Sequence, residues 1–401
     1  WGRLGMRCEW KFSKIGDLGK IITGKTPPTK NQDLWNGNIP FITPRDLQNG
    51  KTALCTERTI SRNGIKVMQS LKLPPKSVCV SCIGNIGYVA MTCSECISNQ
   101  QINSIIVNSN NDADFVYYLM KSLHSTFKNY EGQSTTLSIL NKKHFSDIDI
   151  CIPPLDIQKK IAAILSALDE KIATNRAIND NLQQQAFSVF DNFIANAENN
   201  DCTVSDYAFL NPKRTLAKNQ VARSIDMSQL STSGAFPSGW EMKPFNGGMR
   251  FTNGDTLLAR ITPCLENGKT AFIDFLDDGE VAFGSTEYIV LAPKNDTPPE
   301  MLYCLARYPA FVDYAVKNMN GSSGRQRVSA ETVGQYRLPL FDSHSLSLFK
   351  EIVSPMFLKM RYNSLENMRL AELRDALLPK LMSGEIDVSA VQPLAAKLSF
   401  L

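Results

Sequence analysis

Apolar positions along the chain follow two periods, and each period occurs in both halves of the sequence. Short apolar runs such as residues 78–83 (VCVSCI) and 256–261 (TLLARI) precede a turn that contains glycine, a pattern typical of buried β-strands. Longer stretches that begin near residues 154 and 340 carry apolar residues at alternating spacings of four and three. Such a seam, sustained over several heptads, predicts two long coiled-coil helices.

The elements follow one another in the same order in both halves, which indicates an internal repeat. Each half has an apolar helix, then a polar loop rich in Gly and Ser, then a short strand that ends at proline. In the first half these segments are residues 115–119 (FVYYL), 132–136 (GQSTT) and 152–155 (IPPL), and in the second half residues 301–305 (MLYCL), 321–327 (GSSGRQR) and 338–340 (LPL).

The repeat predicts an α+β fold with two similar domains, separated by two long antiparallel coiled-coil helices. We expect the first domain at residues 9–153 and the first spacer helix at residues 154–197. The second domain is expected at residues 200–339, followed at residues 340–388 by the second spacer helix and a C-terminal tail.

Two asparagines interrupt the apolar seam in the middle of each spacer helix. They are Asn175 and Asn179 in the first helix and Asn363 and Asn367 in the second. If a pseudo-two-fold axis relates the helices, residues whose numbers add up to 542 face each other, so Asn175 meets Asn367 and Asn179 meets Asn363. A buried polar layer lowers stability but fixes the register, because a slip leaves amides without partners. The alternative is that each helix packs on its own domain, with the asparagines partly exposed.

Composition limits the class of protein without naming a function. The 401 residues, 43% hydrophobic and 20% charged, are typical of a soluble globular protein with more than one core. A net charge of +4 neither demands nor excludes a nucleic-acid partner. Ten cysteines without a disulfide framework favour reduced thiols, and the N-terminus lacks the layout of a signal peptide. We therefore expect a cytoplasmic protein with no membrane partner.

Residues 19–26 (GKIITGKT) fit the spacing of a phosphate-binding P-loop, but the surrounding sequence argues against one. Pro27 and Pro28 follow at once, in the turn whose N–H groups a phosphate would need. We interpret the match as a chance occurrence inside a loop, and we expect no nucleotide cofactor.

Two Cys-x-x-Cys pairs, at residues 79–82 and 93–96, have the spacing of a zinc ribbon. The first pair falls in a predicted strand, where residues three apart point to opposite faces. The second half of the repeat has Leu257 and Arg260 at the corresponding positions. We therefore expect buried thiols and no metal, although zinc stays open as a less favoured reading.

Candidates for catalysis are few. His124, His144 and His344 stand alone, and residues 169–171 (DEK) read as the solvated face of a helix. Residues 211–213 (NPK) lack the second proline and the aromatic residue of an amino-methyltransferase motif. No G-x-G-x-x-G pattern links a strand to a helix, so the sequence favours a binding protein over an enzyme.

The loops of both domains are rich in the side chains that read DNA. Arg, Asn and Gln bind base edges, whereas Lys, Ser and Thr bind phosphates. The sharpest group is the pair of arginines with one glutamine in the Gly/Ser loop of the second half, although each residue alone is as well explained by a solvated loop. The DNA-binding candidates are Lys25, Thr26, Lys30, Arg45, Asn85, Asn99, Gln100, Gln133 and Ser134 in the first domain, and Lys213, Arg214, Arg260, Thr262, Lys269, Ser285, Thr286, Ser322, Ser323, Arg325, Gln326 and Arg327 in the second.

These segments, in this order and in duplicate, resemble the specificity subunits of type I restriction–modification systems. The resemblance covers nearly the whole chain. It rests on residues 22–27 (ITGKTP), 39–42 (IPFI), 82–87 (CIGNIG), 97–100 (ISNQ), 152–155 (IPPL), 254–263 (GDTLLARITP), 265–269 (LENGK) and 381–385 (LMSGE).

The resemblance implies a non-catalytic subunit of a DNA adenine-N6 methyltransferase and endonuclease complex. Each domain would read one half of a split, asymmetric sequence in double-stranded DNA, and the helices would set the unread gap. Two modification (methyltransferase) subunits would dock on the helices, and restriction subunits would join them. Three alternatives stay open: a coiled-coil scaffold that binds proteins, a self-contained nuclease or methyltransferase, and the target-recognition part of a related single-complex restriction system.

Overall fold

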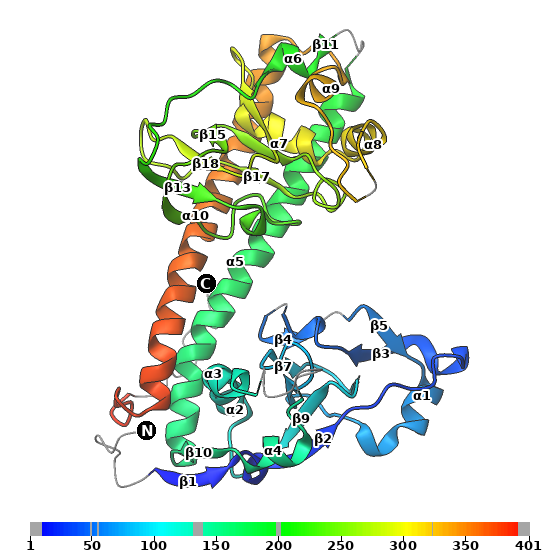
Figure 1. Ribbon diagram of the computed structural model, residues 1–401, viewed down its shortest axis with the longest axis vertical. Coiled ribbons are helices and arrows are strands. Elements are labelled where there is room, and N and C mark those ends of the chain that lie inside the picture. Colours follow the sequence, from blue (N-terminus) through cyan, green and yellow to red (C-terminus); the bar gives the residue numbers. More distant parts are fainter. Residues whose placement is uncertain are drawn as a thin grey trace. The chain divides into compact units, whose positions relative to one another are not determined.

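The computed structural model describes residues 10–48, 50–53, 56–130, 139–197, 202–322 and 324–391. The chain divides into two compact units. The first is formed from residues 1–170 and 371–401, and the second from residues 171–370. Each unit contains part of both long helices, α5 (Leu155–Ala195) and α10 (Ser343–Met382) (Figure 1). None of the helices that the structure describes is both long and apolar enough to cross a membrane.

The first unit has a five-stranded sheet, a three-stranded sheet and a two-stranded ladder. The large sheet has the order β2-β9-β6-β7-β4, the smaller sheet has the order β5-β3-β8, and the ladder joins β1 to β10. The strands are β1 (Lys11–Lys14), β2 (Gly19–Thr23), β3 (Trp35–Ile42), β4 (Thr52–Ala53), β5 (Arg58–Ile60), β6 (Val78–Ser81), β7 (Val89–Thr92), β8 (Ile97–Ser98), β9 (Ile102–Val107) and β10 (Asp149–Ile152).

The second unit has sheets of the orders β12-β19-β16-β17 and β14-β13-β18-β15, with a ladder between β11 and β20. Its strands are β11 (Cys202–Thr203), β12 (Ala208–Leu210), β13 (Val221–Ile225), β14 (Glu241–Pro244), β15 (Met249–Phe251), β16 (Thr256–Ala259), β17 (Thr270–Phe272), β18 (Ala282–Gly284), β19 (Tyr288–Pro293) and β20 (Arg337–Leu338).

The two units repeat the same strand topology. The order β2-β9-β6-β7 returns as β12-β19-β16-β17, and β5-β3-β8 returns as β14-β13-β18. The one parallel pair of each smaller sheet also corresponds, because β3 pairs with β8 and β13 with β18 in parallel. The α+β fold class and the internal repeat predicted from the sequence are therefore confirmed.

Among the described residues, three short helices follow the last strand of the first sheet named for each unit, β9 in the first unit and β19 in the second. Side-chain caps begin several of them: Asp112 accepts from Phe115 N, Asn141 from His144 N and Ser329 from Thr332 N. The helices after β9 are α2 (Ala113–Ser122), α3 (His124–Lys128) and α4 (Lys142–Asp147), and those after β19 are α7 (Pro299–Arg307), α8 (Pro309–Lys317) and α9 (Ala330–Gly334). The other short helices are α1 (Arg62–Val67) and α6 (Val204–Tyr207), with 3-10 turns η1 (Ile15–Leu18), η2 (Gln32–Leu34), η3 (Asp46–Gln48), η4 (Gln69–Leu71) and η5 (Met227–Gln229).

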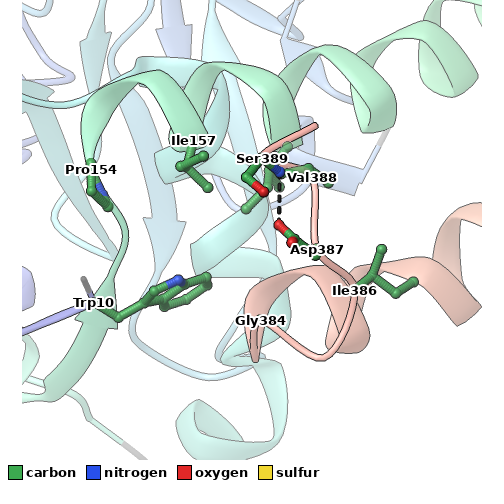
Figure 2. Close-up of a pocket in the computed structure, with 9 residues that line it drawn as sticks. Trp10, Pro154, Ile157, Gly384, Ile386, Asp387, Val388 and Ser389 are labelled. Atoms are coloured by element: carbon green, nitrogen blue, oxygen red, sulfur yellow. Dashed lines mark hydrogen bonds between the residues drawn. The ribbon is translucent and has the colours of Figure 1, made fainter. Parts of the chain in front are cut away.

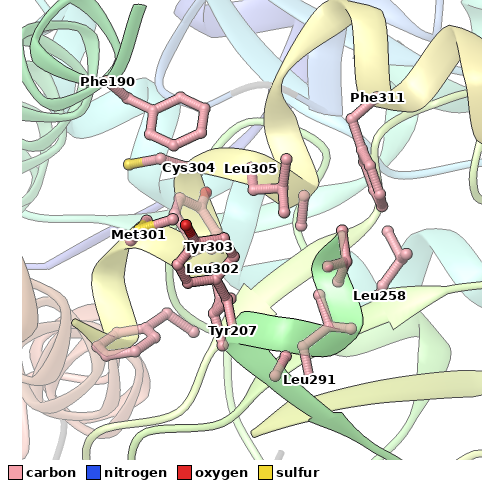
Figure 3. Close-up of a cluster of buried hydrophobic side chains, with 14 of the residues drawn as sticks. Phe190, Tyr207, Leu258, Leu291, Met301, Leu302, Tyr303, Cys304, Leu305 and Phe311 are labelled. Atoms are coloured by element: carbon pink, nitrogen blue, oxygen red, sulfur yellow. The ribbon is translucent and has the colours of Figure 1, made fainter. Parts of the chain in front are cut away.

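The main core of the second unit forms where helix α7 packs between a sheet and the long helices (Figure 3). Met301 to Ala306 are all buried, as expected for a helix that is apolar on every side. Phe357 of α10 meets the rings of Phe272 and Tyr303 edge-on, at centroid distances of 5.2 and 5.5 Å. The long helix is therefore part of the domain core.

The core of the first unit also includes the long helices. Ile161 and Leu165 of α5 and Leu381 of α10 are buried in one cluster with helix α2. At the edge of that cluster, Asp169 Oδ2 accepts from Tyr118 Oη at 2.6 Å and Asp169 Oδ1 accepts from Arg374 Nη1 at 2.7 Å. This largely buried carboxylate therefore connects α2, α5 and α10.

A short segment after α10 closes the first unit. The helix ends at Met382, and two residues later Gly384 has a φ of +74° that favours glycine. Val388 is 3% exposed, and Figure 2 shows the segment of Ile386 to Ser389 beside the start of α5 and Trp10. A cavity of about 30 Å³ remains there, and Lys160 Nζ donates to Ser389 O at 2.6 Å.

A buried ion pair lies in the second unit. Arg214 Nη2 donates to Asp255 Oδ1 at 2.7 Å, and the Asp255 side chain is 1% exposed. Thr252 N also donates to Asp255 Oδ2 at 2.7 Å. Burial nevertheless raises the pKa of the Asp255 carboxyl to about 6, because loss of hydration disfavours the charged form more than its partners favour it.

We expect Asp169→Ala to lower the free energy of unfolding of the first unit by about 3 kcal/mol, because it leaves the Arg374 guanidinium and the Tyr118 hydroxyl without their buried acceptor. Urea denaturation measures this loss. Asp147→Asn is the control, because it removes a carboxylate whose ion pair with Lys14 is half exposed. Equal stability of the two variants would contradict the structural role of Asp169.

We expect the stability of the second unit to fall as the pH rises from about 4 to about 6. In this window the folded state keeps the Asp255 proton that the unfolded state has lost, so the free energy of unfolding is largest below it and decreases by up to about 3 kcal/mol. Asp255→Asn removes this contribution. Denaturation profiles of both proteins measured from pH 4 to pH 7 test the expectation, and parallel profiles would disprove it.

Candidate nucleic-acid interface

In the first unit, the structure brings four of the predicted residues together at one end of the large sheet. Lys25 follows β2, and its N–H donates to Ser98 O at 2.9 Å, at the end of β8. Thr26 Oγ1 donates to Gln100 Oε1 at 2.7 Å. Lys25 and Gln100 are exposed, whereas Asn99 is buried and its amide bonds to Gln101. Asn99 therefore shapes this loop, and Lys25 and Gln100 present its polar surface.

Gly24 makes this close approach possible. A Cβ at this position would lie 2.2 Å from Ser98 O and 2.3 Å from Asn99 O. Such distances are far inside van der Waals contact, so any larger residue must push the loop of Ser98 and Asn99 away. The glycine of the P-loop-like motif therefore serves strand-to-loop packing, and residues 19–23 of that motif form strand β2.

The other predicted residues of the first unit lie in separate loops. Lys30 and Asn85 are exposed, and Arg45 is 80% exposed in an ion pair with Glu57 at 3.0 Å. Over the described residues, no hydrogen bond or ion pair joins these three side chains to Lys25 or Gln100. Gln133 and Ser134 lie outside the described residues.

Equivalent backbone hydrogen bonds align the loops of the two units residue by residue. Cys82 N donates to Gln101 O at 2.7 Å, and Arg260 N donates to Glu287 O at 3.0 Å. Leu140 N donates to Cys82 O at 2.8 Å, and Val328 N donates to Arg260 O at 3.0 Å. The isolated bridges Ile83–Ile139 and Ile261–Arg327 also correspond. Arg260, Glu287 and Arg327 therefore occupy the places of Cys82, Gln101 and Ile139.

In the second unit, these three positions form a charged cluster around Glu287. Arg327 Nε lies 3.0 and 2.9 Å from the two oxygens of the Glu287 carboxylate, and Arg327 Nη2 lies 2.7 Å from Oε1. Arg260 Nε lies 3.9 Å from Glu287 Oε2. The hydrogen bonds from Arg327 lower the pKa of the Glu287 carboxyl, so it is ionised at neutral pH.

Other predicted residues gather around this cluster. Thr262 N and Oγ1 both donate to Gln326 O, at 3.1 and 3.2 Å, and Ser285 Oγ accepts from Glu287 N at 3.1 Å. Thr286, Ser322 and Arg325 are exposed. The loops that contribute Arg260, Ser285 and Arg327 therefore meet at one site.

Three predicted residues of the second unit lie elsewhere, and one lies outside the described residues. The Arg214 guanidinium is held in the buried pair with Asp255, and Lys269 Nζ donates to Met227 O at 2.7 Å. Lys213 is exposed, and Ser323 is not among the described residues. The buried pair gives Arg214 a structural role, so its side chain is a weaker candidate for DNA contact than Arg325.

Glu287 is a site residue that the sequence analysis missed. An acidic residue in a loop gives no sign of DNA reading by itself, because it repels phosphates. Only the alignment of the two halves indicates its place. Glu287 directly follows the polar pair Ser285–Thr286, as Gln101 directly follows the polar pair Asn99–Gln100.

The long helices of the second unit carry the asparagine layer in the expected register. Asn175 Nδ2 donates to Asn367 Oδ1 at 3.0 Å, and Asn363 Nδ2 donates to Asn179 Oδ1 at 2.8 Å. Asn175 and Asn363 are each 1% exposed. The two helices are therefore antiparallel in this unit, and the four asparagines form hydrogen-bonded pairs across the seam, with Asn179 and Asn367 partly exposed.

The cysteines of the first Cys-x-x-Cys pair lie in two different hydrophobic clusters, as residues of a strand that face opposite ways do. Cys79 packs with Leu73 and Cys96, and Cys82 packs with helix α2. Burial raises the pKa of Cys79 to about 11 and that of Cys82 to about 12, so both are thiols at neutral pH. No group of three or more metal-binding side chains occurs in the described part of the chain.

The family model and two known proteins that match this chain belong to type I restriction systems. The family described as "Type I restriction modification DNA specificity domain" matches residues 8–184. The specificity subunit of the type I restriction enzyme MjaIX from Methanocaldococcus jannaschii is 24% identical, over 95% of this chain and 94% of that protein. The specificity subunit of the type I restriction enzyme HindI from Haemophilus influenzae is 34% identical, over 44% of this chain and 39% of that protein.

A solved structure shares the fold. The crystal structure of the S subunit of a type I restriction–modification system from M. genitalium aligns with a TM-score of 0.57 at 17% identity, and it covers 94% of this chain and 98% of that one. These similarities, together with the repeated domain topology, show that the chain resembles the specificity subunits of type I restriction–modification systems.

Proposed function

We propose that this chain is the DNA-reading, non-catalytic subunit of a type I restriction–modification complex. In this role residues 9–153 and residues 200–339 each read one half of a split sequence in double-stranded DNA. The spacer helix within residues 154–197 and the spacer helix that precedes the C-terminal tail within residues 340–388 set the gap between the halves. Two modification subunits dock on the helices, and restriction subunits complete the complex. A subunit with this role works in the cytoplasm, where bacterial DNA lies.

One observation carries the proposal: the same backbone framework occurs twice, with different side chains at the loop positions that correspond. Cys82, Gln101 and Ile139 of one domain are replaced by Arg260, Glu287 and Arg327 in the other. Two readers with one scaffold and different polar groups suit two half-sites of different sequence, because base selectivity depends on the donors and acceptors that reach the groove.

The candidate contacts divide according to what they offer DNA. Lys25, Lys30 and Lys213 are exposed ammonium groups suited to phosphates, whereas Gln100 and Arg325 are exposed groups that can bind base edges. Asn99 and Arg214 support the loops through their own hydrogen bonds.

Selection from a random DNA pool tests the proposal, with the chain purified together with its modification subunits. A split motif with a fixed gap is the expected result. A steep decrease of affinity with salt is also expected, because lysines and arginines displace counterions from the phosphates. If no sequence is enriched even at low salt, the chain is a protein-binding scaffold instead.

Gly24→Ala tests the first reading loop. The added methyl group displaces Ser98 and Asn99, so we expect selectivity for the first half-site to fall roughly tenfold, with the second half-site unaffected. Competition binding with single-base variants of the selected motif measures both. Gly239→Ala is the control, because nothing lies within 4 Å of its new Cβ. Unchanged selectivity in Gly24→Ala would separate this loop from DNA reading.

A heptad insertion tests the helical spacer. Seven residues added to α5 after Glu170 and seven added to α10 before Ala371 keep the seam in phase and lengthen both helices by ~10 Å. We expect the preferred gap to grow by about three base pairs, at ~3.4 Å each. Four residues added at the same two places turn the seam out of phase and serve as the control. A gap of unchanged length in the heptad variant would refute the spacer role.

A further inference from the structure

The Gly/Ser loop of the second unit is closed at its base by backbone hydrogen bonds. Asn320 N donates to Arg327 O and Arg327 N donates to Asn320 O, each at 2.9 Å. Gln326 O accepts from both donors of Thr262. The loop therefore leaves and returns at a fixed place, and Arg325 is exposed near its tip.

Arg327 ties the tip of this loop to Glu287. Its Nε and Nη2 atoms donate to the Glu287 carboxylate, and its Nη1 atom donates to Arg325 O at 3.0 Å. All three nitrogens of this guanidinium thus have an acceptor within the protein. The bidentate pair fixes the plane of the guanidinium, and the third bond fixes the backbone of Arg325.

The first unit shows that the fold does not require this cluster. Gln101 and Ile139 occupy the places of Glu287 and Arg327, with the same backbone hydrogen bonds around them. The charged pair therefore adds a property that belongs to the second domain alone. Because ion pairs near the surface contribute little to stability, stability is a poor explanation for it.

We propose that Glu287 is a positioning residue for DNA recognition: it holds Arg327, which in turn holds the loop, so that Arg325 presents the guanidinium that reads the second half-site. This inference rests on the proposed function. In this arrangement the Arg327–Glu287 pair stays intact when DNA binds. Arg325 meets a bidentate acceptor such as the O6 and N7 atoms of guanine.

The experiment compares variants of the full chain in its complex, using the motif that the wild-type complex selects. Binding is measured for the selected motif, for single-base variants of each half-site and for random DNA, over a range of salt concentrations. The variants are Glu287→Gln, Arg325→Ala, Arg327→Lys and the double variant Glu287→Gln/Arg327→Gln. The double variant Asp313→Asn/Lys317→Gln is the matched control, because it removes an exposed ion pair of α8 in the same unit.

We expect Glu287→Gln, Arg327→Lys and Arg325→Ala each to lower selectivity for the second half-site roughly tenfold and to leave the first half-site unchanged. Arg327→Lys keeps the charge but loses the fork, so its loss of selectivity isolates the positioning geometry. Glu287→Gln also removes the negative charge that neutralises the Arg327 guanidinium, so the affinity of this variant for random DNA rises. A loop that was merely unfolded would lose affinity for both kinds of DNA.

The salt dependence of binding shows whether Arg327 stays paired with Glu287 or contacts a phosphate of the DNA. If the Arg327–Glu287 pair stays closed on DNA, the Glu287→Gln/Arg327→Gln variant keeps the wild-type salt slope. A slope that is flatter by about 0.9 in this variant would show that Arg327 contacts a phosphate, and it would overturn the inference. Full selectivity in Glu287→Gln would also overturn it, provided that the wild type selects a motif. A wild type that selects no motif refutes the proposed function itself.

Discussion

The pairing of the two long helices through buried amides is the constraint on which the rest of the second unit depends. Asn175 and Asn363 are almost fully buried, and a buried amide without a partner is costly. One register gives both of them a partner across the seam. That register also places Phe349 against Phe193, with ring centroids 5.3 Å apart. It further fixes the position along α10 from which Arg361 Nη1 donates to Asp274 O at 3.0 Å. A polar layer of four residues thus positions the domain that packs on it.

The sequence predicted this layer and the repeat because both are encoded in local spacing. A seam of fours and threes and a constant offset between the two copies can be read without knowing any long-range contact. The strand orders could not be predicted in the same way. Strand β12 pairs with β19, and Leu210 faces Leu291 across a long stretch of chain that carries no local signal of the pairing. Such pairings depend on the whole fold.

The sequence analysis grouped loops that lie together in the structure, but it did not predict the partners of their side chains. The Gly/Ser loop and the loop of Ser285 do meet, as expected of residues that act together. What the sequence could not supply were the acidic partners of the arginines. Arg214 finds Asp255 and Arg327 finds Glu287, each about 40 positions away in the chain. Because these carboxylates bind the guanidinium groups of Arg214 and Arg327, the two arginines support the loops and do not present free guanidinium groups to DNA.

The first unit is built from two segments that lie at opposite ends of the chain, and this affects the order in which the two units can fold during synthesis. Its core contains Phe115 and Ile161, but also Leu381 and Val388 from beyond the second unit. During synthesis the ribosome releases residues 171–370 before the last pieces of the first core exist. The second unit can therefore fold while the first still exposes apolar surface, which makes the nascent first unit the part most in need of a chaperone.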